Sequence, residues 1–133
     1  MIIFDSWLVE KLRKSSNNAF PNELFAFLLG RKKNDVYVIK DILNIKNYQR
    51  SPSFFNVDDD ILLKYYNYDN PNLDIVSIFH SHHDSPHPSK TDEKYMLINP
   101  VVWIIYSISK DKFCAYLHDS EKIIEVPIKF TKV

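Results

Sequence analysis

One short stretch of the chain combines two histidines with a serine and an aspartate. His80 and His82 stand one residue apart, and a short proline-containing loop then leads to Ser89 and Asp92. Two imidazoles and one carboxylate form a ligand set that suits Zn²⁺ and leaves a fourth coordination position open for water. Zinc makes water nucleophilic near neutral pH, and a carboxylate far upstream, Glu23, is placed to accept the proton. These residue types predict hydrolysis at a metal centre.

A buried strand over residues 73–79 is expected to present the histidine pair, because this run is apolar and ends directly before His80. Alternate residues of a strand share one face of the sheet. Both His80 and His82 can therefore point toward one ion while Ser81 points away from it.

A helix is expected to begin after the loop at residues 84–88. Ser89 is a suitable cap for this helix, and Asp92 then falls in the first helical turn, folded back toward the histidine pair. The strand alternation turns His83 away from the ion. We expect His83 and His87 at the rim of the site, facing solvent or substrate, and not among the ligands.

Glu23 stands directly before a second apolar run, residues 24–29, which is typical of a strand buried on both faces. Gly30 ends this run and is the single glycine of the chain. A lone glycine at this point predicts either a special backbone angle or a close approach of another segment.

The apolar and polar residues along the rest of the chain predict one α/β domain in which a mixed sheet is flanked by helices on both sides. A strand at residues 2–4 should lead into a helix capped by Asp5 or Ser6 that ends near Ser16. The acidic run at 58–60 is interpreted as the start of a helix that ends near Tyr66, and not as a metal site. Further strands are expected at residues 36–39 and 42–45 (one strand or a pair), 101–108, and 113–117 with 123–128 as a closing hairpin.

The composition excludes several classes of protein. The chain has 133 residues, of which 45% are hydrophobic, so it can form one domain with its own core. Lys and Arg number 17, as do Asp and Glu, and no basic patch for nucleic acid or an anionic membrane is expected. No apolar run reaches membrane-spanning length, and residues 1–5 do not resemble a signal peptide.

The single cysteine, Cys114, excludes an internal disulfide and is typical of a reducing compartment, so a cytoplasmic location is expected. We interpret Cys114 as a small buried residue of a strand. A nucleophilic pair of Cys114 with His118 is an alternative, but no nearby residue would orient the histidine as a base.

The order and types of Glu23, His80, His82, Ser89 and Asp92 resemble the motif of the JAMM (JAB/MPN/Mov34) metallopeptidases. In that motif a glutamate near the N-terminus is followed by His-x-His-Pro, a variable loop and Ser-x-x-Asp. The resemblance implies a small stand-alone member of the prokaryotic type, with a deaminase-like JAB/MPN core that spans residues 1–133. Two positions depart from the pattern, because His83 replaces the usual proline and Ala26 replaces a frequent glycine or cysteine.

The same resemblance assigns roles to the five residues. It implies that His80, His82 and Asp92 bind one Zn²⁺ per chain. Glu23 would then act as the general base, and Ser89 would stabilise the oxyanion. Ser89 alone could also be explained as a helix cap, and both functions are compatible.

The resemblance further implies a zinc-dependent metallopeptidase of deubiquitinase-like isopeptidase type. It would cleave after the C-terminal Gly-Gly tail of a ubiquitin-like or sulfur-carrier protein, either to deconjugate it or to process its precursor. An E1-like activating enzyme would act in the same pathway, and neither nucleic acid nor membrane is an expected partner. The tail is expected to lie along a strand edge near His82 and His83.

Two alternative functions belong to other classes. A non-catalytic scaffold of the same fold usually lacks the metal ligands, which are all present here. A RadC-like DNA-associated relative would share the histidine pair and Ser-x-x-Asp, but the short chain and its net charge of zero count against it. Zinc content and binding to an oligonucleotide would separate the three functions.

Overall fold

The structure is a computed structural model that describes residues 1–45, 73–119 and 121–132. The predicted helix at 58–66 lies outside the described residues. The elements in chain order are β1 Ile2–Asp5, α1 Ser6–Ala19, β2 Phe25–Lys33, β3 Val36–Ile45, β4 Asp74–His82, α3 Lys90–Ile98, β5 Val102–Ser107, β6 Lys112–Asp119, β7 Lys122–Val126 and β8 Ile128–Thr131.

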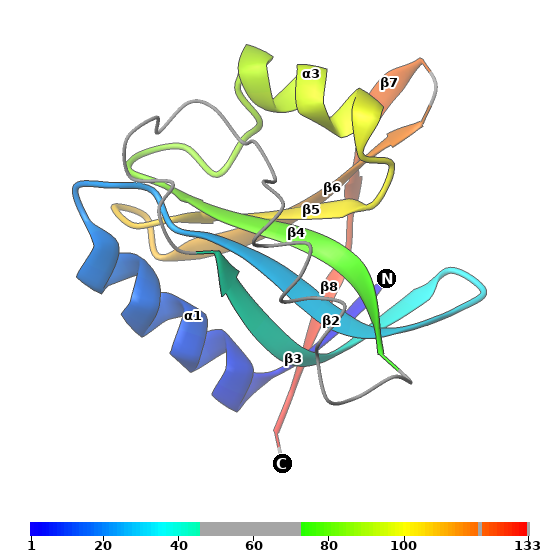
Figure 1. Cartoon of the computed structure of the whole chain (residues 1–133), viewed down its shortest axis with the longest axis horizontal. Helices are drawn as coiled ribbons and strands as arrows, with labels where there is room; N and C mark the ends of the chain where they lie inside the picture. Colours follow the sequence, from blue (N-terminus) through cyan, green and yellow to red (C-terminus); the bar gives the residue numbers. More distant parts are fainter. Residues whose placement is uncertain (46–72, 120, 133) are drawn as a thin grey trace.

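One mixed sheet of eight strands forms the centre of the described structure, in the order β7-β6-β5-β4-β2-β3-β1-β8. β4 pairs in parallel with β5, and β1 pairs in parallel with both β3 and β8. The other neighbours are antiparallel. α1 and α3 cover opposite faces of the sheet (Figure 1), which confirms the predicted mixed sheet with helices on both sides.

Helix α1 is capped as expected, because the Asp5 side chain accepts a hydrogen bond from the Trp7 N–H at 3.3 Å. Its buried side chains recur at helical spacing and pack on the sheet. The helix ends at Ala19, three residues later than predicted. Asn17 lies within the helix, where its side chain donates to the Arg13 carbonyl at 2.9 Å, and the helix ends shortly before Pro21.

Side-chain alternation divides the core into two layers. The layer under α1 contains Ala26, Leu28 and Phe79 from β2 and β4. The layer under α3 contains Phe25, Phe27 and Ile78 from the same strands. A register shift between β2 and β4 interrupts the alternation near Val76, which packs in the α1 layer. From Ile78 onward the even-numbered side chains of β4, which include both histidines, lie on the α3 face.

The closing segment differs from the prediction of one strand over residues 123–128. Pro127 divides it, so β7 ends at Val126 and Ile128 begins β8. β8 then pairs with β1, and the Pro127 carbonyl accepts a hydrogen bond from the Ile2 N–H at 2.8 Å. β7 and β8 occupy opposite ends of the strand order although a single residue separates them.

Gly30 marks a close approach and not a special backbone angle. It lies at a register shift between β2 and β3, and a Cβ atom there would overlap the main-chain carbonyl of Val38. Residues 36–45, left open as one strand or two, form the single strand β3.

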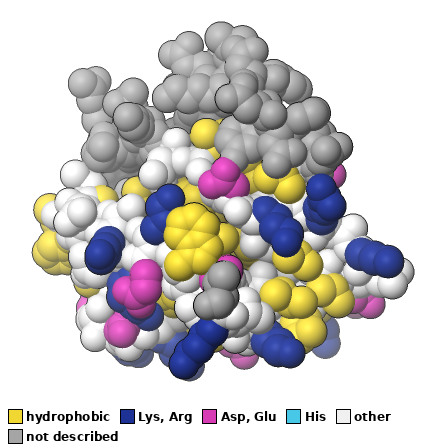
Figure 2. Space-filling view, turned by 90° about the horizontal axis from the view of Figure 1, so that it is seen from below, with side chains coloured by type: hydrophobic (Ala, Val, Ile, Leu, Met, Phe, Trp, Pro, Cys, Tyr) yellow, Lys and Arg dark blue, Asp and Glu magenta, His cyan; other side chains and the backbone are white. Residues whose placement is uncertain are grey.

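The face of the molecule on the α1 side has a mixed surface. Figure 2 shows Lys and Arg scattered among Asp, Glu and hydrophobic side chains, and no histidine of the described residues is visible there. Neither helix in the described part of the chain combines the length and the apolar character that crossing a membrane requires.

Candidate metal centre

Three of the predicted residues meet on the α3 face of the sheet. One donor atom from each of His80, His82 and Asp92 lies within 4.8 Å of the other two. Asp92 Oδ2 is 3.4 Å from His80 Nε2 and 3.1 Å from His82 Nε2. Donors bound tetrahedrally to one zinc ion at about 2.0–2.1 Å stand roughly 3.3 Å apart. The spacing of the three donor atoms therefore fits a single ion of this size.

Asp92 is held in place by a capping box at the start of α3. Ser89 Oγ accepts a hydrogen bond from the Asp92 N–H at 3.1 Å, and Asp92 Oδ2 accepts one from the Ser89 N–H at 2.8 Å. The predicted cap at Ser89 is therefore confirmed. The cap also fixes the carboxylate in front of the two imidazoles.

His80 is almost completely buried, and its ring lies edge-on to Phe25 and Trp103. Both of its ring nitrogens are buried without a hydrogen-bond partner among the described residues. Burial lowers the pKa of His80 against the opposing attraction of Asp92. The neutral imidazole, which is the form that binds a metal, is thus favoured. An unpartnered buried nitrogen is costly, and a metal ion would satisfy it.

His82 is oriented by the loop that follows it. Its Nδ1 lies 2.8 Å from the Ser85 carbonyl, which can only accept, so Nδ1 carries the proton. Nε2 then faces Asp92, and a hydrogen bond of this kind typically orients a metal-binding histidine. Burial lowers the pKa of His82, but the bond to Asp92 and its charge outweigh burial and raise it. The raised pKa favours the imidazolium form of His82 beside Asp92, and binding of a cation at Nε2 would displace that proton.

The ionisation of Asp92 follows from the same contacts. Burial opposes the charged carboxylate, but the contacts from His80 and His82 outweigh it and hold the pKa of Asp92 far below its ordinary value. The site thus combines one anionic oxygen donor with two imidazole donors.

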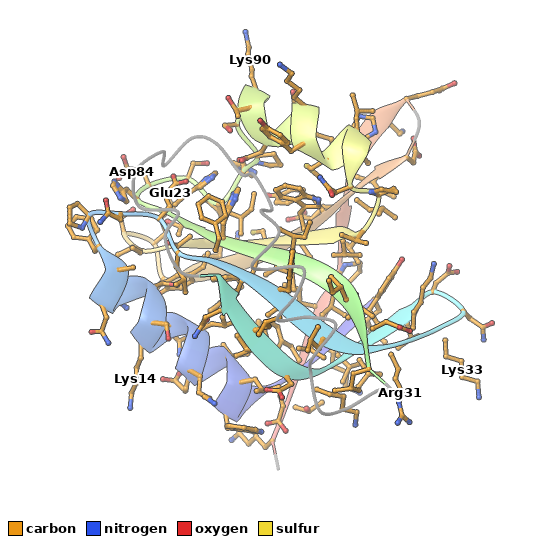
Figure 3. The ribbon with its side chains drawn as sticks, viewed as in Figure 1. Lys14, Glu23, Arg31, Lys33, Asp84 and Lys90 are labelled. Carbon is orange, nitrogen blue, oxygen red and sulfur yellow. The ribbon has the colours of Figure 1, made fainter. Side chains whose placement is uncertain are left out.

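Glu23 lies beside the donor set and is not part of it. Phe25 pairs with His80 across β2 and β4, and continuing this antiparallel register by two residues brings Glu23 opposite His82. Burial raises the pKa of Glu23 to about 7, although the charge of His82 opposes the shift. Figure 3 shows Glu23 on the segment before β2, close to the loop that carries Asp84. A carboxyl that titrates near neutral pH is suited to proton transfer.

An open pocket of about 470 Å³ gives access to these groups. His80 is not exposed in it and lies behind the other donors. The pocket is lined by Glu23, His82, His83, Asp84, Ser85, His87, Pro88, Ser89 and Asp92.

The two additional histidines lie at the rim of this pocket, as expected, and outside the donor set. The exposed ring of His83 lies 4.9 Å from the ring of Phe20. His87 Nδ1 is 2.8 Å from the Tyr116 hydroxyl.

Docking of the tail along a strand edge near His82 and His83 stays a prediction, but the β5 side of β4 is closed to it. β4 is paired with β2 on one side and with β5 on the other. The carbonyls of His82 and His83 already accept hydrogen bonds from the Ile108 and Ser109 N–H groups. Because these carbonyls are paired, a peptide cannot add to β4 on the side of β5. On the other side the pairing of β2 with β4 reaches His80, and the Ser81 N–H donates to the Leu24 carbonyl beyond it.

Cys114 is buried in the core under α3, which confirms its interpretation as a small buried residue. Burial raises the pKa of its thiol, whereas a nucleophilic cysteine needs a lowered one. His118 is four residues further along the same strand, or about 13 Å away in extended chain. The alternative nucleophilic pair is therefore not supported.

Two contributors to the site have no signal in the sequence. Ser85 acts through its main-chain carbonyl, which every residue possesses. Ser81 points away from the donor atoms, as predicted, but its hydroxyl accepts a hydrogen bond from the Leu24 N–H beside Glu23. Leu24 is 57 residues away in the sequence, so no local pattern indicates this contact.

Comparisons with known proteins agree with the predicted fold. The family model described as prokaryotic homologs of the JAB domain matches residues 6–117. The chain is 36% identical over 108 residues to a desampylase from Pyrococcus furiosus, covering 80% of this chain and 74% of that protein.

Two solved structures show the same fold. A protein from Desulfitobacterium hafniense has a TM-score of 0.86 at 22% identity, covering 100% of this chain and 94% of the other. A JAB1/MPN domain protein from Archaeoglobus fulgidus has a TM-score of 0.65 at 20% identity, covering 98% of both chains. These likenesses confirm the predicted single α/β domain with a mixed sheet and a JAB/MPN core.

Proposed function

This chain belongs to the family of prokaryotic homologs of the JAB domain, and from that premise we propose that it is a zinc-dependent isopeptidase. The observation that supports this most directly is the convergence of His80, His82 and Asp92 within 4.8 Å at an open pocket. The similarity to a desampylase supports hydrolysis as the type of reaction.

His80, His82 and Asp92 would hold one zinc ion per chain. The set of two nitrogen donors and one oxygen donor suits zinc better than calcium or magnesium, which prefer oxygen ligands alone. Bound zinc would polarise the carbonyl of the scissile bond and lower the pKa of water.

Glu23 is proposed to move the proton. With a pKa of about 7, its carboxylate can accept a proton from the attacking water and its acid form can then donate to the leaving amine. Its half-buried position beside His82 keeps the proton close to the pocket and away from bulk solvent.

Ser89 is proposed to stabilise the oxyanion that develops on the scissile carbonyl. Its oxygen accepts from the Asp92 N–H as a helix cap, which leaves its hydroxyl proton free to donate. Ser89 also lines the pocket. One side chain can therefore cap α3 and donate to the reacting group.

The proposed substrate is the C-terminal tail of a ubiquitin-like or sulfur-carrier protein. The tail would enter the pocket between Glu23 and the loop that carries His83 and His87. A Gly-Gly sequence would bring its main chain close to the donor set without a side chain in the way. Either deconjugation or precursor processing would use the same bond and the same residues.

In this proposal residues 1–133 form one JAB domain, and the protein acts in the cytoplasm. An E1-like activating enzyme would work in the same pathway, and nucleic acid and membranes would not be partners. The complete donor set argues against a non-catalytic scaffold. The balanced charge argues against a RadC-like DNA-associated relative.

The test is cleavage of ubiquitin-like fusions with Gly-Gly tails by the zinc-loaded protein, with a chelator-treated sample and Asp92→Asn as controls. We expect cleavage after the tail in the first sample alone. If the zinc-loaded protein cuts none of the fusions, or if Asp92→Asn cuts them equally well, the proposed function is wrong.

A further inference from the structure

The end of β4 and the segment before β2 are joined by an irregular pair of hydrogen bonds. The Ser81 N–H donates to the Leu24 carbonyl at 3.0 Å. The Leu24 N–H donates to Ser81 Oγ at 2.8 Å. In a regular antiparallel pair both bonds join main-chain groups. Here a side-chain hydroxyl replaces a main-chain carbonyl.

Ser81 is completely buried and lies on the α1 side of β4, opposite to the donor atoms of the metal centre. It therefore does not line the pocket. Its hydroxyl acts on the residue that directly follows Glu23. Because His80 and His82 flank Ser81, the two bonds tie the main chain next to Glu23 to the strand that carries both imidazoles.

The other hydrogen bonds of the segment at residues 20–24 do not reach β4. Among the described residues, the Phe20 and Asn22 N–H groups donate to the end of α1, at Ser16 and Ala19. The pairing of β2 with β4 begins only at Phe25. The contact with Ser81 is thus the hydrogen-bonded link between β4 and the part of the segment that carries Glu23.

We propose that Ser81 is a positioning residue that holds Glu23 within reach of the reacting groups. This inference rests on the proposed function, because it assigns Glu23 the proton transfer. A general base must come within about 2.6–3.2 Å of the proton that it accepts, directly or through one water. A displacement of about 1 Å in such a geometry can cost on the order of 10²-fold in rate.

Ser77 provides a matched control on the same strand and the same face. It is also completely buried, and its hydroxyl donates to the Val102 carbonyl of β5 at 2.7 Å. Ser77→Ala therefore removes one buried hydrogen bond from β4 without touching the segment that carries Glu23. A purely structural role of the Ser81 hydroxyl would give both alanine variants similar kinetics.

The experiment compares Ser81→Ala, Ser81→Thr and Ser77→Ala with the wild type. We expect Ser81→Ala to keep its zinc and its KM while kcat falls about 10- to 100-fold. Ser81→Thr keeps a hydroxyl and should restore most of kcat, and Ser77→Ala should resemble the wild type. Exchange of the Leu24 amide hydrogen should be accelerated in Ser81→Ala alone.

A second readout does not depend on substrate. Addition of Zn²⁺ should shift the ¹³C resonance of the Glu23 carboxyl in the wild type and in Ser77→Ala, and should shift it less in Ser81→Ala. Wild-type turnover or a wild-type shift in Ser81→Ala would overturn the inference, as would an equal loss of kcat in Ser77→Ala. If the expected shifts occur but no fusion is cleaved, the proposed function fails and the positioning role of Ser81 stands.

Discussion

Ser89 and Asp92 hold each other at the start of α3, and the oxygen of Asp92 that accepts from the Ser89 N–H at 2.8 Å also faces the donor atoms of both histidines. A helix cap and a candidate metal ligand are thus the same atom, Asp92 Oδ2. Changes at Ser89 should therefore affect both the stability of the helix and the chemistry of the pocket, and the two effects can be measured on one variant.

The purified protein should contain about one zinc ion per chain. Asp92→Ala and His82→Ala each remove a proposed ligand and should lose the metal, as elemental analysis would show. His87→Ala is the matched control, because His87 lines the same pocket but lies outside the donor set. A metal-free wild type after growth in zinc-replete medium, or full occupancy in the two ligand variants, would refute the ligand assignment.

Glu23→Gln should separate metal binding from turnover. The amide keeps the shape of the side chain, so zinc should remain, but it cannot transfer the proton. Loss of a general acid–base group typically lowers the rate roughly 10²–10⁴-fold, so kcat should fall at least about 10²-fold. Glu93→Gln, an exposed residue of α3 outside the pocket, should have no effect on kcat. Near-normal turnover of Glu23→Gln would remove Glu23 from the mechanism.

The pKa of Glu23 predicts a pH-dependent stability of the metal-free protein. Burial raises this pKa from 4.5 to about 7 in the folded state. The stability that the protonated carboxyl contributes is therefore complete below about pH 4.5 and is lost as the pH rises through 7. Glu23→Gln removes the titration, so its gain in thermal midpoint over the wild type should be larger at pH 8 than at pH 4. Thermal unfolding of both metal-free proteins measures this, and an equal difference at the two pH values would contradict it.

Ser89→Ala should lower both rate and stability while the zinc stays bound. The lost cap costs about 1 kcal/mol of the free energy of unfolding. The lost oxyanion donor costs on the order of 10²–10³-fold in kcat. Ser89→Thr keeps the hydroxyl and serves as the control for both measurements. A lower thermal midpoint with unchanged kcat would leave Ser89 as a helix cap alone.

Substitution in the substrate tail should block cleavage more than binding. A leucine in place of the last glycine adds a side chain where the main chain must approach the donor set. Cleavage of the substituted fusion should therefore fall far more than its affinity, which a binding assay on Glu23→Gln would report. Equal cleavage of both tails, or rapid degradation of casein, would show that the pocket does not select for small residues.

The donor set of His80, His82 and Asp92 could be predicted from the sequence because its members lie close together in the chain. The apolar run before His80 defines a strand, and alternation within it directs His80 and His82 to one face. The cap at Ser89 is equally local and defines the helix turn that contains Asp92. The family resemblance added the roles of these residues, which spacing alone does not assign.

The contacts that the sequence could not predict join distant segments. The sequence leaves residues 36–45 open as one strand or two, and it is their pairing with β2 across a register shift that makes them the single strand β3. Ser81 was assigned to the correct face, yet its partner Leu24 is 57 residues away. Pairing over such distances depends on the whole fold. The residue pattern within either segment does not indicate which distant segment will be its partner.

The pairing of β1 with β8 also determines when the sheet can be completed. β1 contains the first residues of the sheet to be synthesised, and β8 contains the last. One side of β1 can pair with β3 early, but its other side has no partner until residues 128–131 have been made. Loss of the residues after Val126 would remove an entire edge strand and leave the N-terminal strand open to pairing with other chains. The C-terminal strand therefore covers β1, whose Ile2 and Phe4 are completely buried, and takes the edge position of the sheet itself.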